Sequence, residues 1–278
     1  MALVRLGVAG WPVAHSRSPA MQNAALAACG LAEEWRFQLL PVPPELFAET
    51  IRALPAQGFR GINVTIPHKP AALAVAARAS ARAQAIGAAN LLLFEPDGQI
   101  RADNTDAPAL SAALGAILPV SGATVLVLGA GGSARAAVWA LRDVGASEIR
   151  IWNRTPERAQ VLADDLGAVT VRTADAADVL VNCTSVGLDP DDTAPADPLD
   201  GLPLDPGDLA GYRAVVDFVY RGDSAGTPLL SAARAAGVPA IDGLELLVGQ
   251  GALSFEQFTG MAAPVEVMRE AVGLSSRR

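Results

Sequence analysis

The chain has 278 residues, of which 51% are hydrophobic and 18% are charged, as in folded globular proteins and unlike disordered chains. This length suits two domains better than a single hydrophobic core. The formal net charge of −8 argues against a nucleic-acid partner, because proteins that bind the phosphate backbone need a basic face. The two cysteines, Cys29 and Cys183, lack the spacing of a disulfide framework or a zinc site, so we expect no metal.

The amino-terminal residues 1–6 lead directly into a predicted strand and show no features of a signal peptide. The sequence also lacks an uninterrupted apolar run of about 18 residues, the length that a membrane-spanning helix needs. We therefore expect a cytoplasmic protein without a membrane partner.

Short apolar runs alternate with helical stretches, a pattern typical of α/β proteins. The first part of the chain predicts strands at Val4–Ala9, Trp35–Val42 and Gly61–Ile66, and helices from Pro19, over Pro44–Leu54 and over about Lys69–Ala85. Asp97-Gly98 then separates Leu91–Phe94 from Ile100–Asp103, which predicts a β-hairpin that adds antiparallel strands to the first sheet.

A second set of elements begins near Ala123. Thr124–Leu128 is a continuous apolar run, as expected of a strand that is buried on both faces. The sequence next predicts a helix to about Val144, strands at Glu148–Trp152, Val179–Asn182 and Ala214–Val219, helices at Pro156–Leu166 and Thr227–Ala236, and a helical tail after Asp242.

The loop after Thr124–Leu128 fits the pattern GxGxxG/A through Gly129, Gly131 and Ala134, with Gly132 and Ser133 between them. Glycines permit a tight turn and a close approach of the backbone, and the following helix offers free N–H groups to a pyrophosphate. Because this loop lies between a predicted strand and a predicted helix, it is predicted to bind a dinucleotide.

The end of the next strand bears on the choice of dinucleotide. An NAD site usually carries Asp or Glu there, to accept hydrogen bonds from the ribose. This chain instead has Asn153-Arg154-Thr155, with Arg158 one helical turn after Arg154. Two guanidinium groups and a hydroxyl suit a 2′-phosphate, so we predict NADP. Thr155-Pro156 also fits a helix N-cap followed by proline, and the two roles are compatible.

Two serines follow the first predicted strand. The hydroxyls of Ser16 and Ser18 are placed to donate to a substrate carboxylate above the end of that strand. Ser18-Pro19 is equally typical of an ordinary helix start. The local sequence leaves both interpretations open.

Lys69 follows the third predicted strand, and Asn104-Thr105-Asp106 follows the hairpin. A lysine paired with a carboxylate is an economical acid/base unit for reducing a carbonyl group, because the lysine exchanges a proton with the substrate oxygen as hydride moves. The alternatives are a solvated lysine and a helix N-cap at Asp106, with Pro108 two residues later.

The ordered series of motifs resembles the shikimate dehydrogenase family over essentially the whole chain. The matching segments are Gly10–Pro19, Asn63–Lys69, Gly87–Asn90, Asn104–Asp106, the glycine loop, Asn153–Thr155, Asn182–Thr184, Val216–Tyr220 and Asp242–Gln250. The resemblance implies that Lys69 and Asp106 are the catalytic pair, without settling which of them moves the proton.

The resemblance implies further roles. It places Ser16 and Ser18 at the substrate carboxylate, and Thr184 at the cofactor. The residues that it places at or near the substrate ring are Thr65, Asn90, Asp106, Tyr220 and Gln250. It implies a two-domain α/β fold, with a mixed-sheet substrate domain over 1–105, a Rossmann-type NADP-binding domain over 106–242, and C-terminal helices over 243–278 that return to the substrate domain. The protein is expected to be a monomer or a homodimer.

Four positions depart from the family pattern: Gln22, Leu91, Ala107 and Leu246 stand where the family usually has histidine, threonine, glycine and methionine. None of these departures removes a presumed catalytic group. They leave open an enzyme that acts on quinate or on an amino analogue of shikimate. A non-catalytic NADP-sensing protein is another alternative, although a sensor has no need of an acid/base pair.

Overall fold

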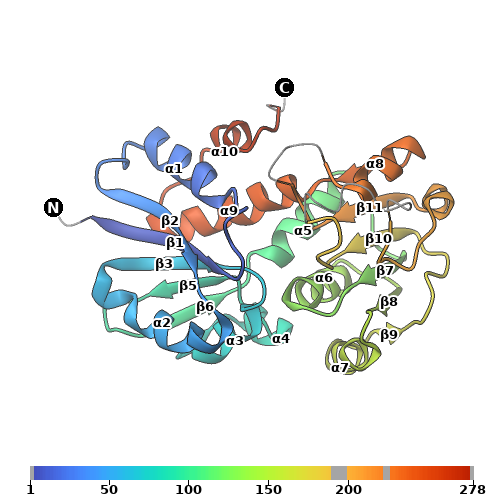
Figure 1. Ribbon diagram of the computed structural model, residues 1–278, viewed down its shortest axis with the longest axis horizontal. Coiled ribbons are helices and arrows are strands. Elements are labelled where there is room, and N and C mark those ends of the chain that lie inside the picture. The colour runs from blue at the N-terminus through green and yellow to red at the C-terminus, as the bar shows by residue number, and fades with distance from the viewer. Residues whose placement is uncertain (1–2, 189–198, 222–225, 276–278) are drawn as a thin grey trace. The chain divides into compact units, whose positions relative to one another are not determined.

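The computed structural model describes residues 3–188, 199–221 and 226–275. The chain divides into two compact units, one formed by Met1–Asp106 with Leu247–Arg278 and the other by Ala107–Leu246. Each unit contains a six-stranded sheet (Figure 1). None of the described helices is both long enough and apolar enough to cross a membrane.

The first unit contains a mixed sheet in the order β2-β1-β3-β5-β6-β4. The strands are β1 (Val4–Gly10), β2 (Trp35–Pro41), β3 (Phe59–Val64), β4 (Arg78–Ala79), β5 (Leu91–Phe94) and β6 (Ile100–Asp103). The helices are α1 (Ser18–Ala28), α2 (Phe47–Ala53), α3 (Lys69–Val75), α4 (Ala81–Ile86) and α10 (Val265–Ala271), together with most of α9 (Gly243–Thr259). β1 runs parallel to β2 and β3, whereas β5 is antiparallel to both β3 and β6.

The core of the first unit explains why these segments fold as they do. α2 buries Phe47 and Ile51 in the same apolar cluster as Ile62 of β3 and Leu92 of β5. The ring of Phe258 in α9 packs against the ring of Phe37 in β2, with 6.5 Å between the ring centroids. The sheet therefore has helices on both faces (Figure 1), which accounts for apolar side chains on both sides of its central strands.

The second unit contains a wholly parallel sheet in the order β12-β11-β10-β7-β8-β9. Its strands are β7 (Thr124–Leu128), β8 (Glu148–Trp152), β9 (Val169–Thr170), β10 (Val179–Asn182), β11 (Ala214–Asp217) and β12 (Ala240–Ile241). Its helices are α5 (Asp106–Gly115), α6 (Gly132–Asp143), α7 (Pro156–Leu166) and α8 (Pro228–Ala235). The strand order reverses between β7 and β10, which is the doubly wound arrangement of dinucleotide-binding domains.

Several predicted boundaries are wrong by a few residues. The helix predicted over Pro44–Leu54 begins with a 3₁₀ turn, and the region Lys69–Ala85 is interrupted by β4. β4, β9 and β12 have two residues each, which is too short for a hydrophobic period to reveal them. The strand predicted to reach Ile66 ends at Val64, because Ile66 is exposed and precedes a proline that has no N–H to donate.

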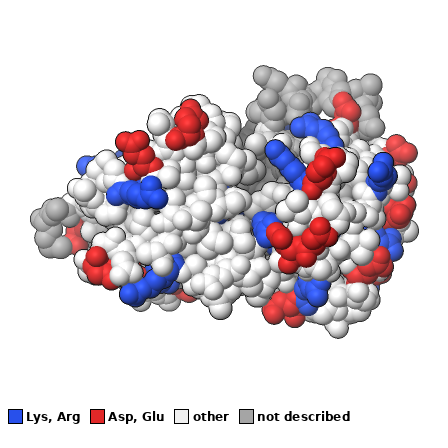
Figure 2. All heavy atoms as spheres, turned by 90° about the horizontal axis from the view of Figure 1, so that it is seen from below, with Lys and Arg blue, Asp and Glu red and all other residues white. Residues whose placement is uncertain are grey.

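Charged side chains do not form a field of one sign on the face that Figure 2 shows, where acidic and basic groups are interspersed. The whole chain contains more acidic than basic residues, 29 against 21. The face in Figure 2 offers no basic stripe for a nucleic acid.

One buried carboxyl group organises the second unit. Asp217, at the end of β11, is fully buried and accepts hydrogen bonds from Asn182 Nδ2 (2.9 Å), Val219 N (3.0 Å) and Thr227 Oγ1 (2.5 Å). Thr227 in turn caps α8 by accepting from Leu230 N. Burial raises the pKa of Asp217 to about 7, although the three hydrogen bonds oppose the shift; the nearby Asp242 carboxylate adds to it.

This raised pKa predicts a pH-dependent stability. The ordinary pKa of an aspartate is 3.8. At a pH between this value and about 7, Asp217 is protonated in the folded chain and ionised in the unfolded chain. The free energy of unfolding therefore falls as pH rises through this range, on the order of 1 kcal/mol per pH unit. Asp217→Asn removes this contribution, so urea unfolding at pH 5 and pH 8 should show a smaller fall in the variant. An identical fall in both proteins would contradict the assignment.

Candidate active site

The topology of the first sheet brings four predicted site segments to one edge. β1 and β3 are parallel, so the loops that follow Gly10 and Val64 leave the sheet at the same edge. β5 begins opposite the end of β3, where Asn63 pairs with Leu91, and Leu91 pairs with Asp103 at the end of β6. Residues far apart in sequence therefore meet at this edge.

A buried ion pair lies at the centre of this edge. Lys69 Nζ donates to Asp106 Oδ2 at 2.7 Å, and the two side chains are 9% and 8% exposed. Asn90 Nδ2 donates to the other carboxylate oxygen at 2.8 Å, and the Lys69 carbonyl accepts from Ala89 N at 2.9 Å. A buried pair is tolerated when further hydrogen bonds satisfy its remaining atoms, as Asn90 does for Asp106 here.

Lys69 is the only lysine in the chain, since the other 20 of its 21 basic residues are arginines. A guanidinium group stays protonated in proteins and cannot exchange a proton, whereas an ammonium group can. The buried position beside Asp106 therefore carries the one side chain of these 21 that can exchange a proton, whereas the buried basic positions 221 and 269 carry arginine.

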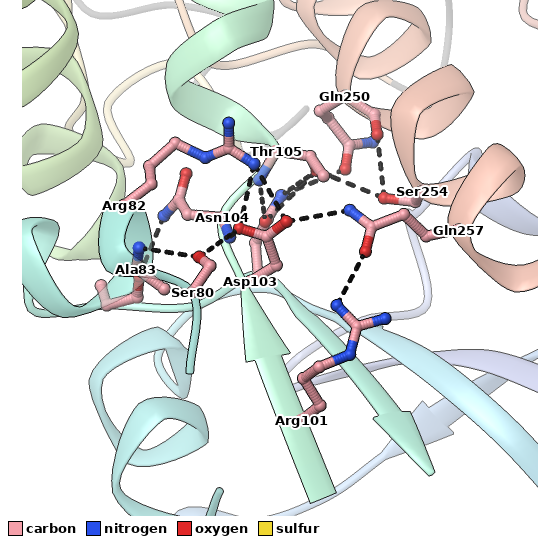
Figure 3. Close-up of polar contacts among 12 residues, drawn as sticks. Ser80, Arg82, Ala83, Arg101, Asp103, Asn104, Thr105, Gln250, Ser254 and Gln257 are labelled. Carbon is pink, nitrogen blue, oxygen red and sulfur yellow. Dashed lines mark hydrogen bonds and ion pairs between the residues drawn. The ribbon is translucent and has the colours of Figure 1, made fainter. Parts of the chain in front are cut away.

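Asn90 also joins the ion pair to α9. Its Nδ2 lies 3.3 Å from Gln250 Oε1 and 2.9 Å from Thr105 Oγ1, and its Oδ1 accepts from Thr105 N at 2.7 Å. Figure 3 shows Gln250, Ser254 and Gln257 pointing from one helix toward the segment that carries Thr105. The predicted site residues Lys69, Asn90, Asp106 and Gln250 therefore form one connected cluster.

Two polar residues of this cluster were not singled out from the sequence. Ser254 Oγ accepts from Asn63 Nδ2 at 2.8 Å and lies 3.2 Å from Thr105 Oγ1, and both Ser254 and Asn63 are buried. An asparagine near the end of an otherwise apolar strand was the available signal for Asn63. Ser254 lies within a largely apolar helix, and its available signal was its helical spacing from Gln250 and Gln257.

The serine loop lies at the same edge without a hydrogen bond to the ion pair among the described residues. Ser18 is the first residue of α1, while Arg17 occupies the N-cap position without a side-chain cap. Ser18-Pro19 therefore begins the helix, as the alternative interpretation predicted, but Ser18 does not act as its side-chain cap. Ser18 is buried, and its N–H donates to Ser16 Oγ at 3.3 Å. Thr65 is half-buried.

In the second unit, the glycine loop joins β7 to α6. Gly129 has φ of 107°, and a Cβ there would lie 3.0 Å from the carbonyl carbon of Cys183 at the end of β10. A side chain larger than hydrogen would therefore separate the two strand ends. Gly131 is the N-cap of α6 and provides no side-chain cap, and the N-terminal end of a helix favours an anion.

Asn182 connects Thr184, which follows β10, to the buried Asp217. Its Oδ1 accepts from Thr184 N at 3.0 Å and from Thr184 Oγ1 at 2.7 Å, while its Nδ2 donates to Asp217. Thr184 is thereby held beside the glycine loop, where the strand order reverses. Tyr220 is half-buried and follows β11 in this unit.

The segment after β8 carries two exposed arginine side chains. Arg154 and Arg158 are exposed, and neither guanidinium group forms an ion pair or a hydrogen bond with another residue that the structure describes. Thr155 occupies the N-cap position of α7, but its hydroxyl makes no cap hydrogen bond. Asn153 Nδ2 donates to Thr155 O at 2.8 Å and shapes the turn.

Three family models match this chain. They describe the shikimate dehydrogenase substrate binding domain (residues 8–92), shikimate / quinate 5-dehydrogenase (113–186) and the shikimate 5'-dehydrogenase C-terminal domain (243–272). A shikimate dehydrogenase (NADP(+)) of Methylobacterium radiotolerans is 43% identical and aligns over 94% of this chain and 93% of its own length. One from Anaeromyxobacter dehalogenans is 44% identical, over 96% and 94%.

Solved structures give the same result. The shikimate 5-dehydrogenase of Thermus thermophilus in complex with NADP(H) and shikimate has a TM-score of 0.83 at 39% identity, over 97% of this chain and 98% of that one. The shikimate dehydrogenase of Aquifex aeolicus has a TM-score of 0.86 at 33% identity, over 98% of each chain. The predicted α/β fold class and the family resemblance are confirmed, and the chain belongs to the shikimate dehydrogenase family.

Proposed function

We propose that this protein is an NADP-dependent shikimate dehydrogenase, which interconverts shikimate and 3-dehydroshikimate in the pathway to aromatic amino acids. The observation that carries the proposal is the buried Lys69–Asp106 pair at 2.7 Å, held by Asn90 and connected to Gln250. Relatives that cover nearly the whole chain and are named for this NADP-dependent activity support it.

The residues of the second unit fit NADP. The uncapped start of α6 and the close approach at Gly129 suit a pyrophosphate, and the exposed Arg154 and Arg158 suit a 2′-phosphate. Gly132, Ser133, Ala134, Asn153, Thr155 and Thr184 complete the proposed cofactor site. When bound, NADP⁺ would take up the hydride and NADPH would supply it.

The residues of the first unit would handle the proton. As the hydroxyl at ring carbon 3 is oxidised, its proton passes to the Lys69–Asp106 pair, and it returns along the same route in the reduction. Asp106 keeps the lysine in place, and Asn90 orients the carboxylate. Thr65, Asn90 and Gln250 of this unit would bind the ring side, with Ser16 and Ser18 at the carboxylate. Tyr220, a residue of the second unit, would be near the substrate by the family resemblance alone.

A second candidate within the same fold is an enzyme for another polyhydroxylated ketone. A ligand-free 5-ketofructose reductase of a Gluconobacter strain has a TM-score of 0.80 at 28% identity, over 98% of each chain. The four departures Gln22, Leu91, Ala107 and Leu246 keep quinate and aminoshikimate open as substrates. A non-catalytic NADP sensor would have no use for the acid/base pair.

Initial rates with four substrates test the proposal. Shikimate, quinate and aminoshikimate are each assayed with NADP⁺ and NAD⁺, and 5-ketofructose is assayed with NADPH and NADH. Shikimate with NADP⁺ should give the highest kcat/KM. A higher value for another substrate would identify the alternative enzyme, and no turnover with any of them would favour the sensor. The cytoplasmic location and the monomeric or homodimeric state stay predictions.

Replacing Lys69 should separate catalysis from binding. Lys69→Ala should lower kcat about 10²- to 10⁴-fold, the range for a positioned acid/base group, and should change KM much less. Lys69→Arg keeps the charge but not the exchangeable proton, so its kcat should also fall. A kcat within a few-fold of wild type, together with a steep rise in KM, would make Lys69 a binding residue.

Cofactor choice should depend on Arg154 and Arg158. Losing one charge-assisted contact should weaken NADP binding by about 1.5–3 kcal/mol and leave NAD binding nearly unchanged. Arg213→Ala is a matched control, because Arg213 is an exposed arginine at the start of β11, the opposite edge of the same sheet. Titration calorimetry with both cofactors measures the effect. Equal losses for NADP and NAD in Arg154→Ala would refute the assignment.

The carboxylate site has its own test. Ser18→Ala should raise KM for shikimate and leave the melting temperature almost unchanged, since Ser18 makes no helix cap. The double change Ser16→Ala with Ser18→Ala should weaken use of the acid far more than use of its methyl ester. An unaltered preference between acid and ester would place the carboxylate elsewhere.

A further inference from the structure

Asp103 is a buried carboxylate next to the proposed active site and lies three residues before Asp106. It is 6% exposed and accepts five hydrogen bonds at its two oxygens. Oδ1 accepts from Ser80 Oγ (2.6 Å), Arg82 Nη2 (3.0 Å) and Asn104 N (2.7 Å), whereas Oδ2 accepts from Arg82 Nη2 (2.9 Å) and Gln257 Nε2 (2.9 Å). Figure 3 shows these donors converging on Asp103.

The donors come from elements that are distant in sequence. Ser80 is the N-cap of α4 and also accepts from Ala83 N, and Arg82 lies in the first turn of that helix. Gln257 belongs to α9, 154 positions away from Asp103. One carboxylate therefore joins the end of β6, the start of α4 and a helix from the far end of the chain.

The contact with α9 is one of three at regular spacing. Gln250, Ser254 and Gln257 are separated by four and three residues, so they lie on one face of the helix. Gln250 contacts Asn90, Ser254 contacts Thr105, and Gln257 contacts Asp103. The first two contacts reach the cluster around the ion pair directly, and the third lies two helical turns from Gln250.

The charge of Asp103 strengthens this third contact. Burial alone would raise its pKa, but hydrogen bonds from Ser80, Gln257 and Asn104 and the charge of Arg82 together lower it. Asp103 is therefore an ionised acceptor at neutral pH, and hydrogen bonds to ionised groups are the stronger ones.

We propose that Asp103 is a positioning residue for the reaction, which fixes α9 against the segment 103–106 and thereby places Gln250 and Asp106 around the substrate ring. This inference depends on the proposed function, because it assumes that Gln250 binds the ring. Asp103 acts through Gln257 and through the backbone of Asn104 and does not touch the substrate.

The two oxygens of Asp103 permit a sharp test. In Asp103→Asn, the amide nitrogen in place of Oδ2 faces the donors of Gln257 and Arg82, so donors oppose each other at this position. KM for shikimate should rise about tenfold, comparable to the loss of one hydrogen bond to a charged group, while KM for NADP⁺ stays within twofold. The decrease in kcat should be much smaller than that of Lys69→Ala.

An exchange of the two groups should restore binding. In the double variant Asp103→Asn with Gln257→Glu, the new carboxylate accepts from the new amide and from Arg101 Nη1, although the ion pair with Arg82 is not restored. If the contact with α9 carries the effect, KM should return to within about threefold of wild type. Gln257→Met removes the contact but keeps the Arg82–Asp103 pair, and serves as the second variant if Asp103→Asn does not fold; its KM should rise several-fold. Arg60→Ala is the matched control, since Arg60 Nε donates to Phe258 O of the same helix, one residue from Gln257. Its KM should be unchanged.

The outcomes separate this inference from the proposed function. If wild type turns over shikimate and Asp103→Asn lowers only the melting temperature, Asp103 is a structural residue and the inference is wrong. If the double variant has the same KM as Asp103→Asn, the contact with Gln257 does not carry the effect, and the inference is also wrong. If wild type does not turn over shikimate, the proposed function fails first and this inference fails with it.

Discussion

The arrangement of the first unit depends on one interaction, the ion pair between Lys69 and Asp106. Two charges with about a tenth of their side-chain surface exposed lose most of their hydration, and their attraction offsets that loss only when the geometry is good and the remaining atoms are satisfied. Asn90 satisfies one carboxylate oxygen, and Thr105 and Gln250 hold Asn90 in turn. The polar side chains at this edge of the sheet can be understood as the support of this pair.

The strand directions in the mixed sheet determine where the residues that support the ion pair lie. β6 runs in the same direction as β3, and only β5 runs the other way; if β5 also ran parallel to β3, Asn90 would lie at the edge opposite Asp103. The antiparallel hairpin brings the residue before β5 and the residues after β6 to the end of β3. α9 then covers this edge with one polar face, although most of its other residues are apolar.

In the second unit, the proposed cofactor site depends more on backbone geometry than on pairs of side chains. Its parallel sheet places Gly129 and Thr184 at neighbouring strand ends on either side of the reversal in strand order. The buried Asp217 links Asn182 to the start of α8, so the loops that follow β10 and β11 share one hydrogen-bond network.

The sequence was sufficient to predict much of the fold. The continuous apolar run Thr124–Leu128 and the amphipathic segment Pro156–Leu166 were predicted with their observed bounds, since hydrophobic burial determines them. The glycine loop was predicted because the chemistry of a tight turn is local. The two-residue strands could not be predicted, since their stability comes from neighbouring strands.

The candidate site was predictable to a smaller extent. Lys69 and Asp106 were paired from their chemistry and from the family resemblance, and the structure brings them together. Their roles in the reaction stay a prediction, as do those of the other proposed site residues. The contacts of Asp103, Asn63 and Ser254 could not be predicted, because they join segments that only the folded chain brings together.

A double-mutant cycle on Lys69 and Asp106 tests the central claim most directly. The free-energy changes in kcat/KM for Lys69→Met, Asp106→Asn and the double variant give the coupling between the two side chains. If they act as one acid/base unit, the double variant should be no slower than the slower single variant, within a factor of about three. Losses that multiply in the double variant would contradict the claim, because they would show that the two residues act independently.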